Sequence, residues 1–283
     1  MLKRGYEPIL VDYLPKELPR YGYGKPPHSL LLQAIERNRE QYRETLTHFV
    51  GFLDKFSAIP LWSREAIAAD PTIPYWETGS SSAWFPGIDA ISLYSMLALN
   101  HPAQYLEIGS GLSTLIARRS VSDNNLHTVI TSIDPHPRRE IDAACDNVIR
   151  LPLEDIDLSI FDQLNAGDIL FVDGSHRVFM NSDATILFLE VIPRLNNGVF
   201  IHIHDIFLPY DYPPKYANER RYYSEQYLLA VAILSGEKDF DIVLPNYFVS
   251  QDSELNGILD PIFSHEHLSG IKRRGASFWL VSK

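Results

Sequence analysis

The chain has 283 residues, 45% of them hydrophobic and 22% charged, which is typical of a globular protein with a sizeable core. Its formal net charge of −11 disfavours phosphate backbones, so we expect a small-molecule partner and no nucleic acid. No apolar run reaches the ~20 residues of a membrane span, and the N-terminus lacks the apolar segment of a signal peptide. A single cysteine, Cys145, is expected to be an inert thiol, which predicts a cytoplasmic protein.

Residues 1–87 are predicted to form an arm followed by a helical extension. Residues 1–26 are rich in Pro, Tyr and Gly and follow no steady period. From Ser29 to Phe56, apolar residues recur at spacings of three, four and seven, which predicts a helix. We expect that helix to pack on the main domain. The alternatives are a homodimer contact and a lid over a site. The stretch 57–87, with several Trp, Pro and Gly residues, is interpreted as a loop-rich wall.

From residue 88 the chain alternates between strand and helix patterns. Strands are predicted at 103–109, 127–134, 147–152, 166–174, 197–205, 240–246 and 276–283, and helices at 89–100, 112–122, 137–146, 182–195 and 224–236. This alternation predicts one α/β domain, 88–283, with a doubly wound, mostly parallel sheet. The last two strands lack a clear crossover helix, which allows an antiparallel pair at one edge. Ligands of such sheets bind beyond the carboxyl ends of the strands.

The first strand runs into a glycine turn, "YLEIGSGLSTLIA", in which Gly109 and Gly111 allow a ligand to approach the backbone closely. The dinucleotide motif of an NAD(P)-dependent oxidoreductase has a third glycine, but Thr114 stands at that position. Glu107 also lies just before the turn, where a carboxylate disfavours a pyrophosphate and favours a cationic ligand. The alternative is a glycine turn that serves packing alone.

The acid followed by G-x-G resembles the first motif of class I S-adenosylmethionine-dependent methyltransferases. S-adenosylmethionine fits the pattern, because it carries a sulfonium and an ammonium group and no phosphate. The resemblance implies a Rossmann-like fold in which Asp134 binds the ribose hydroxyls and Glu154 or Asp155 reaches the adenine amine. The predicted cofactor-binding residues are Glu107, Gly109, Ser110, Gly111, Ser113, Asp134, Glu154 and Asp155.

Polar side chains also follow two later strands, in "ILFVDGSHRVF" and "VFIHIHDI". These strands are predicted neighbours, so Asp173, His176, His204 and Asp205 should converge at one edge of the sheet. His202, farther from the edge, is predicted to be a buried, hydrogen-bonded histidine, with an iron site of His202, His204 and Asp205 as an alternative.

The pair "FVDGSH" and "HIHDI" resembles a small-molecule O-methyltransferase branch that includes metal-dependent sugar methyltransferases. The resemblance implies that Asp173 and Asp205 bind Mg²⁺ and that His176 removes the proton of the acceptor. That branch often has an acid where this chain has His204. Because Mg²⁺ prefers oxygen ligands, a histidine there weakens the case for magnesium or points to a transition metal. The candidate metal ligands are Asp173, His204 and Asp205, and the candidate catalytic residues are His176, Asp173 and Asp205.

The segment "PYDYPPKYANERRYYSEQYLLA" is predicted to form a long loop over the site. Its aromatic and hydrogen-bonding side chains favour a sugar, a phenol or another hydroxylated acceptor, with Arg220, Tyr222, Tyr223 and Gln226 as candidate contacts. Alternatively, the loop only packs on the N-terminal arm. The leading prediction is an S-adenosylmethionine-dependent O-methyltransferase. The alternatives are an NAD(P)-dependent oxidoreductase, a metal-dependent hydroxylase or hydrolase, and a non-catalytic binding module.

Overall fold

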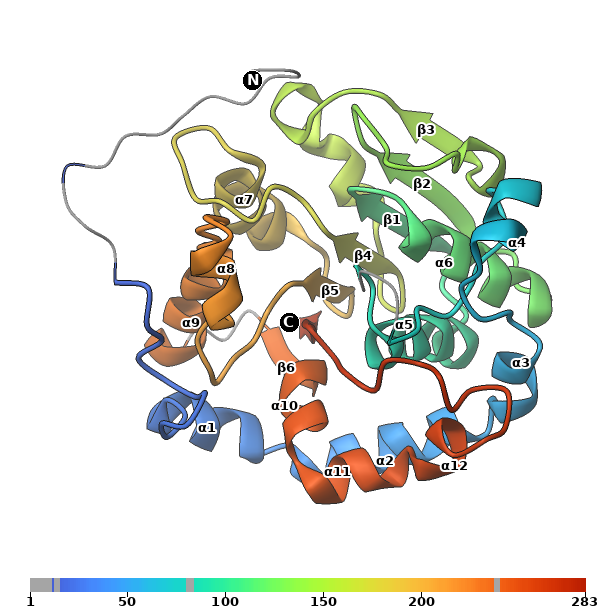
Figure 1. Ribbon diagram of the computed structural model, residues 1–283. Helices are drawn as coiled ribbons and strands as arrows, with labels where there is room; N and C mark the ends of the chain where they lie inside the picture. The colour runs from blue at the N-terminus through green and yellow to red at the C-terminus, as the bar shows by residue number, and fades with distance from the viewer. Residues whose placement is uncertain (1–11, 13–15, 80–83, 237–239) are drawn as a thin grey trace.

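The computed structural model describes residues 12, 16–79, 84–236 and 240–283 (Figure 1). Its centre is a seven-stranded sheet with the order β3-β2-β1-β4-β5-β7-β6. The strands are β1 (Gln104–Ile108), β2 (Val129–Ile133), β3 (Asn147–Ile149), β4 (Ile169–Val172), β5 (Phe200–His204), β6 (Phe240–Pro245) and β7 (Ser277–Ser282). The first five are parallel, and β7 runs antiparallel to both β5 and β6. The predicted doubly wound, mostly parallel sheet is therefore confirmed.

The strand order places ligands at one edge of the sheet. The chain runs outward from β1 through β2 to β3 and then returns to β4 on the other side of β1. At such a reversal the connections leave β1 and β4 in opposite directions, so a crevice opens beyond their carboxyl ends. The segments that follow β1, β2, β4 and β5 all meet there. The expected antiparallel pair also exists, although β7 lies inside the sheet and only β6 forms the edge.

Helices cover both faces of the sheet, with α5 and α6 on one side and α7 and α9 on the other (Figure 1). After the N-terminal extension the helices are α5 (Gly87–Asn100), α6 (Leu112–Asp123), α7 (Asp183–Ile186), α8 (Pro214–Asn218), α9 (Glu225–Ser235), α10 (Asn246–Gln251), α11 (Ser253–Ile258) and α12 (Asp260–Phe263). Helix α5 is buried along nearly its whole length, because α6, α2 and α10 pack around it. Across the described ranges, no helix combines the length and apolarity that crossing a bilayer requires.

The single helix predicted from Ser29 to Phe56 is wrong, because the structure has α1 (Ser29–Glu36), α2 (Arg39–Val50) and α3 (Leu53–Ser57). One break is at Asn38, whose backbone is not helical and whose Nδ2 donates to the Ile242 carbonyl at 2.8 Å. The apolar stripe survives the break, and its side chains lie in the same core as the sheet. The extension therefore packs on the main domain. Residues of the same chain cover the apolar face for which a homodimer contact was the alternative.

Two helices predicted in the main domain also differ. Residues 137–146 form only a 3₁₀ turn, Asp142–Ala144, because few of their side chains are buried and Arg138 and Arg139 extend over aromatic rings. The helix expected at 182–195 starts as α7 and continues as a wider π turn and a 3₁₀ turn. Pro193, which has no N–H to continue an α-helix, lies in that last turn.

The predicted N-terminal arm and wall are described only in part. Residues 1–11 and 13–15 of the arm and 80–83 of the wall lie outside the described residues. The wall contains α4 (Arg64–Ala69) and the buried Trp76, whose Nε1 donates to the Phe56 carbonyl at 2.9 Å. The boundary near residue 87 stays a prediction, because side chains from both sides of it share one apolar core.

Candidate active site

The glycine turn joins the ends of β1 and β4. Gly109 has a left-handed φ of 79°, and a Cβ added there would lie 2.0 Å from the carbonyl oxygen of Asp173. Only glycine allows the two segments to lie this close. Gly111 then caps α6, and its backbone N–H donates to Thr114 Oγ1 at 3.0 Å. Thr114, at the position of the third glycine of a dinucleotide motif, thus stabilises the turn through its side chain.

Glu107 lies beneath this turn and is fully buried. Its carboxylate accepts hydrogen bonds from Tyr105 Oη at 3.0 Å and Ser113 Oγ at 3.3 Å, and from the Thr114 hydroxyl. Burial raises the pKa of Glu107 to about 8. The acid that precedes the glycines therefore holds strand, turn and helix together from below.

A cavity of about 320 Å³ opens beyond the turn, between the segments that follow β1, β2 and β4. Asp134, at the end of β2, lines it and accepts from Ser110 N at 2.8 Å and from Ser110 Oγ at 3.0 Å. Glu154 lines the same cavity, whereas Asp155 is exposed beside it. A neighbouring cavity of about 560 Å³ contains Ser113 and the other face of the turn. The predicted cofactor residues thus gather around two adjoining cavities, except the buried Glu107 and the exposed Asp155.

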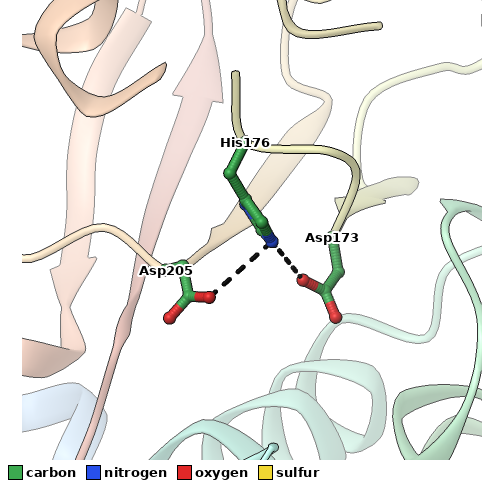
Figure 2. Close-up of side chains that lie close together, drawn as sticks. All are labelled: Asp173, His176 and Asp205. Atoms are coloured by element: carbon green, nitrogen blue, oxygen red, sulfur yellow. Dashed lines mark ion pairs between the residues drawn. The ribbon is translucent and has the colours of Figure 1, made fainter. Parts of the chain in front are cut away.

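Figure 2 shows that Asp173, His176 and Asp205 converge from the loops after β4 and β5. His176 Nε2 lies 3.1 Å from Asp173 Oδ1 and 3.7 Å from Asp205 Oδ2. On the opposite side of the ring, His176 Nδ1 lies 2.5 Å from Glu225 Oε1, at the start of α9. The imidazole therefore contacts three carboxylates. Glu225 is absent from the sequence predictions, because an acid in the first turn of a helix is common for local reasons.

The backbone at this cluster is unusual. His176 and Asp205 both have left-handed φ values, 62° and 54°. For residues other than glycine, such a backbone costs roughly 1–2 kcal/mol and is often found at functional sites. At Asp205 the conformation is supported by Tyr216, whose hydroxyl donates to Asp205 Oδ1 at 2.8 Å. The fold thus holds two strained residues with their side chains facing each other.

The charged groups of the cluster shift one another's pKa values. Burial opposes a charged imidazole, but Glu225, Asp173 and Asp205 outweigh it and raise the pKa of His176 well above its ordinary value. Burial also acts to raise the pKa of Asp173, but the imidazoles of His204 and His176 reverse this and hold it well below its usual range. Burial raises the pKa of Glu225. The three carboxylates around His176 therefore favour the protonated form of its imidazole.

His204 and His202 share one face of β5 but differ in their surroundings. Both ring nitrogens of His204 are buried and form no hydrogen bond with the part of the chain that the structure describes; Nδ1 lies 3.3 Å from Asp173 Oδ1 and Nε2 lies 3.5 Å from Asp89 Oδ2. His202 stacks on Trp279 at 3.9 Å and shares a 2.7 Å hydrogen bond with Ser277 Oγ. Burial lowers the pKa of His202. At His204 burial acts in the same direction, but Asp173 and Asp205 outweigh it and raise the pKa. The prediction of a buried, hydrogen-bonded His202 is confirmed.

Asp89, in α5, is the second acid that the sequence predictions omit. It is fully buried and accepts from Ser277 Oγ at 2.6 Å, Ala276 N at 2.8 Å and Asn246 Nδ2 at 3.0 Å. Asp89 therefore links α5 to β7 through hydrogen bonds. Its Oδ2 also lies beside His204 Nε2, on the side of the ring opposite Asp173.

Among the described residues, the set with metal-ligand spacing is Asp173, His176 and Asp205, whose ligand atoms lie within 4.8 Å of one another. His176 takes the place that the sequence prediction gave to His204, which lies next to this set. His202 is not in the set, because its ring is engaged with Ser277 and Trp279.

The four predicted acceptor contacts lie in different places. The Tyr223 ring is 4.4 Å from the His176 ring, beside the cluster. Arg220 and Tyr222 are exposed, and Gln226 is buried, where its Oε1 accepts from Phe207 N at 2.9 Å. The same loop also contacts the arm, since Asp211 Oδ2 accepts from Arg20 N at 2.6 Å. Sequence reasoning missed Lys215, Tyr216 and Arg221, which do line a cavity next to Asp205.

Comparison with known proteins matches the central part of the chain to a protein family. Residues 106–206 match the model of a family described as a methyltransferase domain. The solved plantazolicin methyltransferase BpumL in complex with SAH is similar, with 13% identity, 89% of this chain and 99% of that chain covered, and a TM-score of 0.43. SAH-bound PaMTH1 from Podospora anserina has 16% identity, covers 75% of this chain and 91% of its own, and has a TM-score of 0.37. No curated protein sequence matches the chain.

The class of the protein rests on the family model and on the observed sheet. The matched range runs from β1 to just beyond β5 and includes the glycine turn, Asp134, Asp173, His176 and Asp205. Fold and motif together define a class I methyltransferase, an enzyme that depends on S-adenosylmethionine. The acid followed by G-x-G, which suggested this class, lies within the matched methyltransferase domain.

Proposed function

We propose that the protein transfers the methyl group of S-adenosylmethionine to a hydroxyl group of a small molecule. The observation that carries this proposal is the position of His176, whose Nε2 lies between Asp173 and Asp205. Asp173 also lines both cavities beside the glycine turn. A methyl donor in those cavities would therefore lie next to a group able to take a proton from an alcohol or phenol.

The two cavities suit the two halves of the cofactor. In this proposal the nucleoside occupies the cavity of about 320 Å³, with Asp134 at the ribose and Glu154 toward the adenine. The methionine part extends into the cavity of about 560 Å³, along Ser110, Gly111 and Ser113. Arg139 lines this second cavity, and its buried Nη1 has no hydrogen-bond partner among the described residues, which suits the carboxylate of the methionine part.

His176 is the proposed general base. When bound, S-adenosylmethionine would supply the methyl group as a sulfonium and leave as a neutral thioether, and His176 Nε2 would take the proton that the acceptor hydroxyl loses. Glu225 at Nδ1 fixes the direction of the ring. The three carboxylates make the imidazole a strong base, and a sulfonium cation beside it favours the neutral form that accepts a proton. Such a base typically contributes ~10²–10⁴-fold to the rate.

A divalent cation is compatible with the same cluster. Asp173 and Asp205 offer two carboxylates, and His176 or His204 offers a nitrogen nearby. Oxygen ligands alone suit Mg²⁺, and added nitrogen ligands suit a transition metal. When bound, such a cation lowers the pKa of a coordinated hydroxyl. The chain itself contributes the carboxylates that hold the charge and the imidazole that receives the proton.

The proposal is tested with purified protein, S-adenosylmethionine and a panel of catechols, phenols and sugars. Formation of S-adenosylhomocysteine and of a methyl ether is the expected result. Calorimetry with S-adenosylmethionine and with NADH provides the control. Binding of NADH without S-adenosylmethionine would favour an oxidoreductase, and methylation of nitrogen or carbon alone would contradict an O-methyltransferase.

Metal assistance is tested separately by treatment with EDTA followed by titration with Mg²⁺, Mn²⁺ or Zn²⁺. We expect turnover to fall on chelation and to return with one of these ions. Unchanged turnover after complete chelation would leave His176 as the base and remove the cation from the proposal.

A further inference from the structure

The cavity next to Asp205 has a strongly positive lining. It measures about 310 Å³, lies on the β5 and β7 side of the cluster, and has His204 and Asp205 in its wall. Its positive side chains come from two segments far apart in the sequence, Lys215 and Arg221 after β5 and Lys272 and Arg274 before β7. Four lining side chains are thus cationic, whereas only Asp205 and Glu219 bring carboxylates.

Most of these cations form no ion pair with a described residue. Of these four cations, only Arg221 forms an ion pair within the described part of the chain, through Nε to Glu219 at 2.6 Å. Burial, followed by the nearby Arg274, lowers the pKa of Lys215, as expected where positive charges crowd without compensation. The chain as a whole has a net charge of −11, so this concentration of cations is opposite to its average surface.

Aromatic rings hold the cations at the cavity. The Arg221 guanidinium lies 4.7 Å from the centre of the Tyr216 ring and 5.7 Å from that of Trp84. Arg274 lies 5.7 Å from the centre of the Phe207 ring. A guanidinium placed against a ring is partly desolvated and oriented, and its planar N–H groups match the two oxygens of a carboxylate or phosphate.

We propose that the methyl acceptor is an anion, a hydroxylated small molecule whose carboxylate or phosphate group binds Lys215, Arg221, Lys272 and Arg274. This inference rests on the proposed O-methyltransferase function and names its substrate class. The acid group lies toward the cations while a hydroxyl on the same molecule extends past Asp205 to His176. Asp205 belongs to both the cavity and the cluster, 3.7 Å from His176 Nε2, and thus marks the path between them.

Matched pairs of acceptors test the charge requirement. Turnover is compared for 3,4-dihydroxybenzoate and its neutral methyl ester, and for glucose 6-phosphate and glucose. We expect a kcat/KM at least roughly tenfold higher for the anionic member of whichever pair is methylated, as befits one charge-assisted contact. The active pair tells a carboxylate acceptor from a phosphate acceptor. Equal or faster methylation of a neutral member would overturn the inference.

Arg274→Gln and its sequence neighbour Arg273→Gln provide matched variants. Arg273 pairs with Asp260 at 2.6 Å outside the cavity, so it controls for the loss of a cation from the same segment. We expect Arg274→Gln to raise KM for the anionic acceptor roughly tenfold or more and to leave the neutral member unchanged. Arg273→Gln should change neither value. An equal loss with both acceptors in Arg274→Gln would overturn the inference.

Binding separates this inference from the proposed function if no acceptor in the panel is methylated. The protein is loaded with S-adenosylhomocysteine and titrated with 3,4-dihydroxybenzoate and with inorganic phosphate in a calorimeter. Binding of either anion to the wild type and to Arg273→Gln, weakened in Arg274→Gln, supports an anion site. Binding of S-adenosylhomocysteine without either anion overturns the anionic acceptor alone, whereas failure to bind S-adenosylhomocysteine overturns the proposed function.

Discussion

The cofactor side and the acceptor side of the cleft are built in different ways. Much of the cofactor side comes from one stretch of the chain, the turn after β1 and the segments that follow β2 and β3, and the segment after β4 and described residues between 62 and 85 complete its two cavities. The acceptor side is assembled from α5, the loops after β4 and β5, and the segment before β7. A local motif therefore specifies the centre of the first side, whereas the tertiary fold alone specifies the second.

His176→Gln gives the sharpest separation of the two sides. We expect turnover to fall by ~10²–10⁴-fold, because glutamine cannot take up the proton. The affinity for S-adenosylmethionine should change little, because the turn and Asp134 are untouched. Rates of methyl transfer and calorimetric titrations measure the two effects. Normal turnover would show that another group accepts the proton.

Gly109→Ala tests the contact through which the two sides meet. The added methyl lies 2.0 Å from the Asp173 carbonyl oxygen at a left-handed φ. We expect a loss of about 1–2 kcal/mol from the backbone and about 1–3 kcal/mol from overpacking. Urea unfolding measures this loss as a lower free energy of unfolding. Gly257→Ala, in α11 with open space around it, is the control and should be neutral or stabilising.

Asp134→Asn is expected to act on the cofactor side alone. Loss of one charged hydrogen-bond acceptor costs about 1.5–3 kcal/mol, or roughly a 10–100-fold weaker affinity for S-adenosylmethionine. Saturating cofactor should restore most of the turnover. Asp162→Asn, at an exposed acid that pairs with Arg194, is the control. A fall in turnover that high cofactor does not relieve would mean that the two sides are not separable.

Glu107→Gln tests the buried support of the turn through pH. The pKa of Glu107 is about 8 in the folded protein and 4.5 ordinarily, so the folded chain keeps a proton that the unfolded chain loses above pH 4.5. Between these values the free energy of unfolding should fall with rising pH by about 1.4 kcal/mol per pH unit. Glutamine does not titrate, so the variant should lack this slope. Equal slopes would mean that Glu107 is ionised when folded.

The contrast between the two sides also explains what could be predicted from the sequence. An apolar strand such as "ILFV" and the G-x-G turn are each recognised from residues that are adjacent in the sequence. The sheet and the residues around the turn could therefore be predicted. The long helix was predicted wrongly because the apolar spacing continues across Asn38, and only a contact with β6 reveals the break.

The missing site residues are those that acquire a role by long-range packing. Glu225 looks like an ordinary acid at a helix start, and Asp89 like a polar residue in a helix, until α9 and α5 are placed beside β4 and β5. Lys272 and Arg274 are nearly sixty residues from Lys215 in the chain, and nothing local relates them. Within the loop after β5, composition identified the segment, but the exposed Arg220 was chosen where Arg221 lines the cavity.

Trp84 belongs to both sides of the cleft. Its half-exposed ring lines the cavity of about 560 Å³ and that of about 310 Å³, with the Arg138 guanidinium 4.9 Å and the Arg221 guanidinium 5.7 Å from its centre. A ligand that draws either guanidinium away alters the surroundings of the same indole. The intrinsic fluorescence of this one side chain therefore offers an optical signal for occupancy of each compartment, and any influence of one occupant on the other must be mutual.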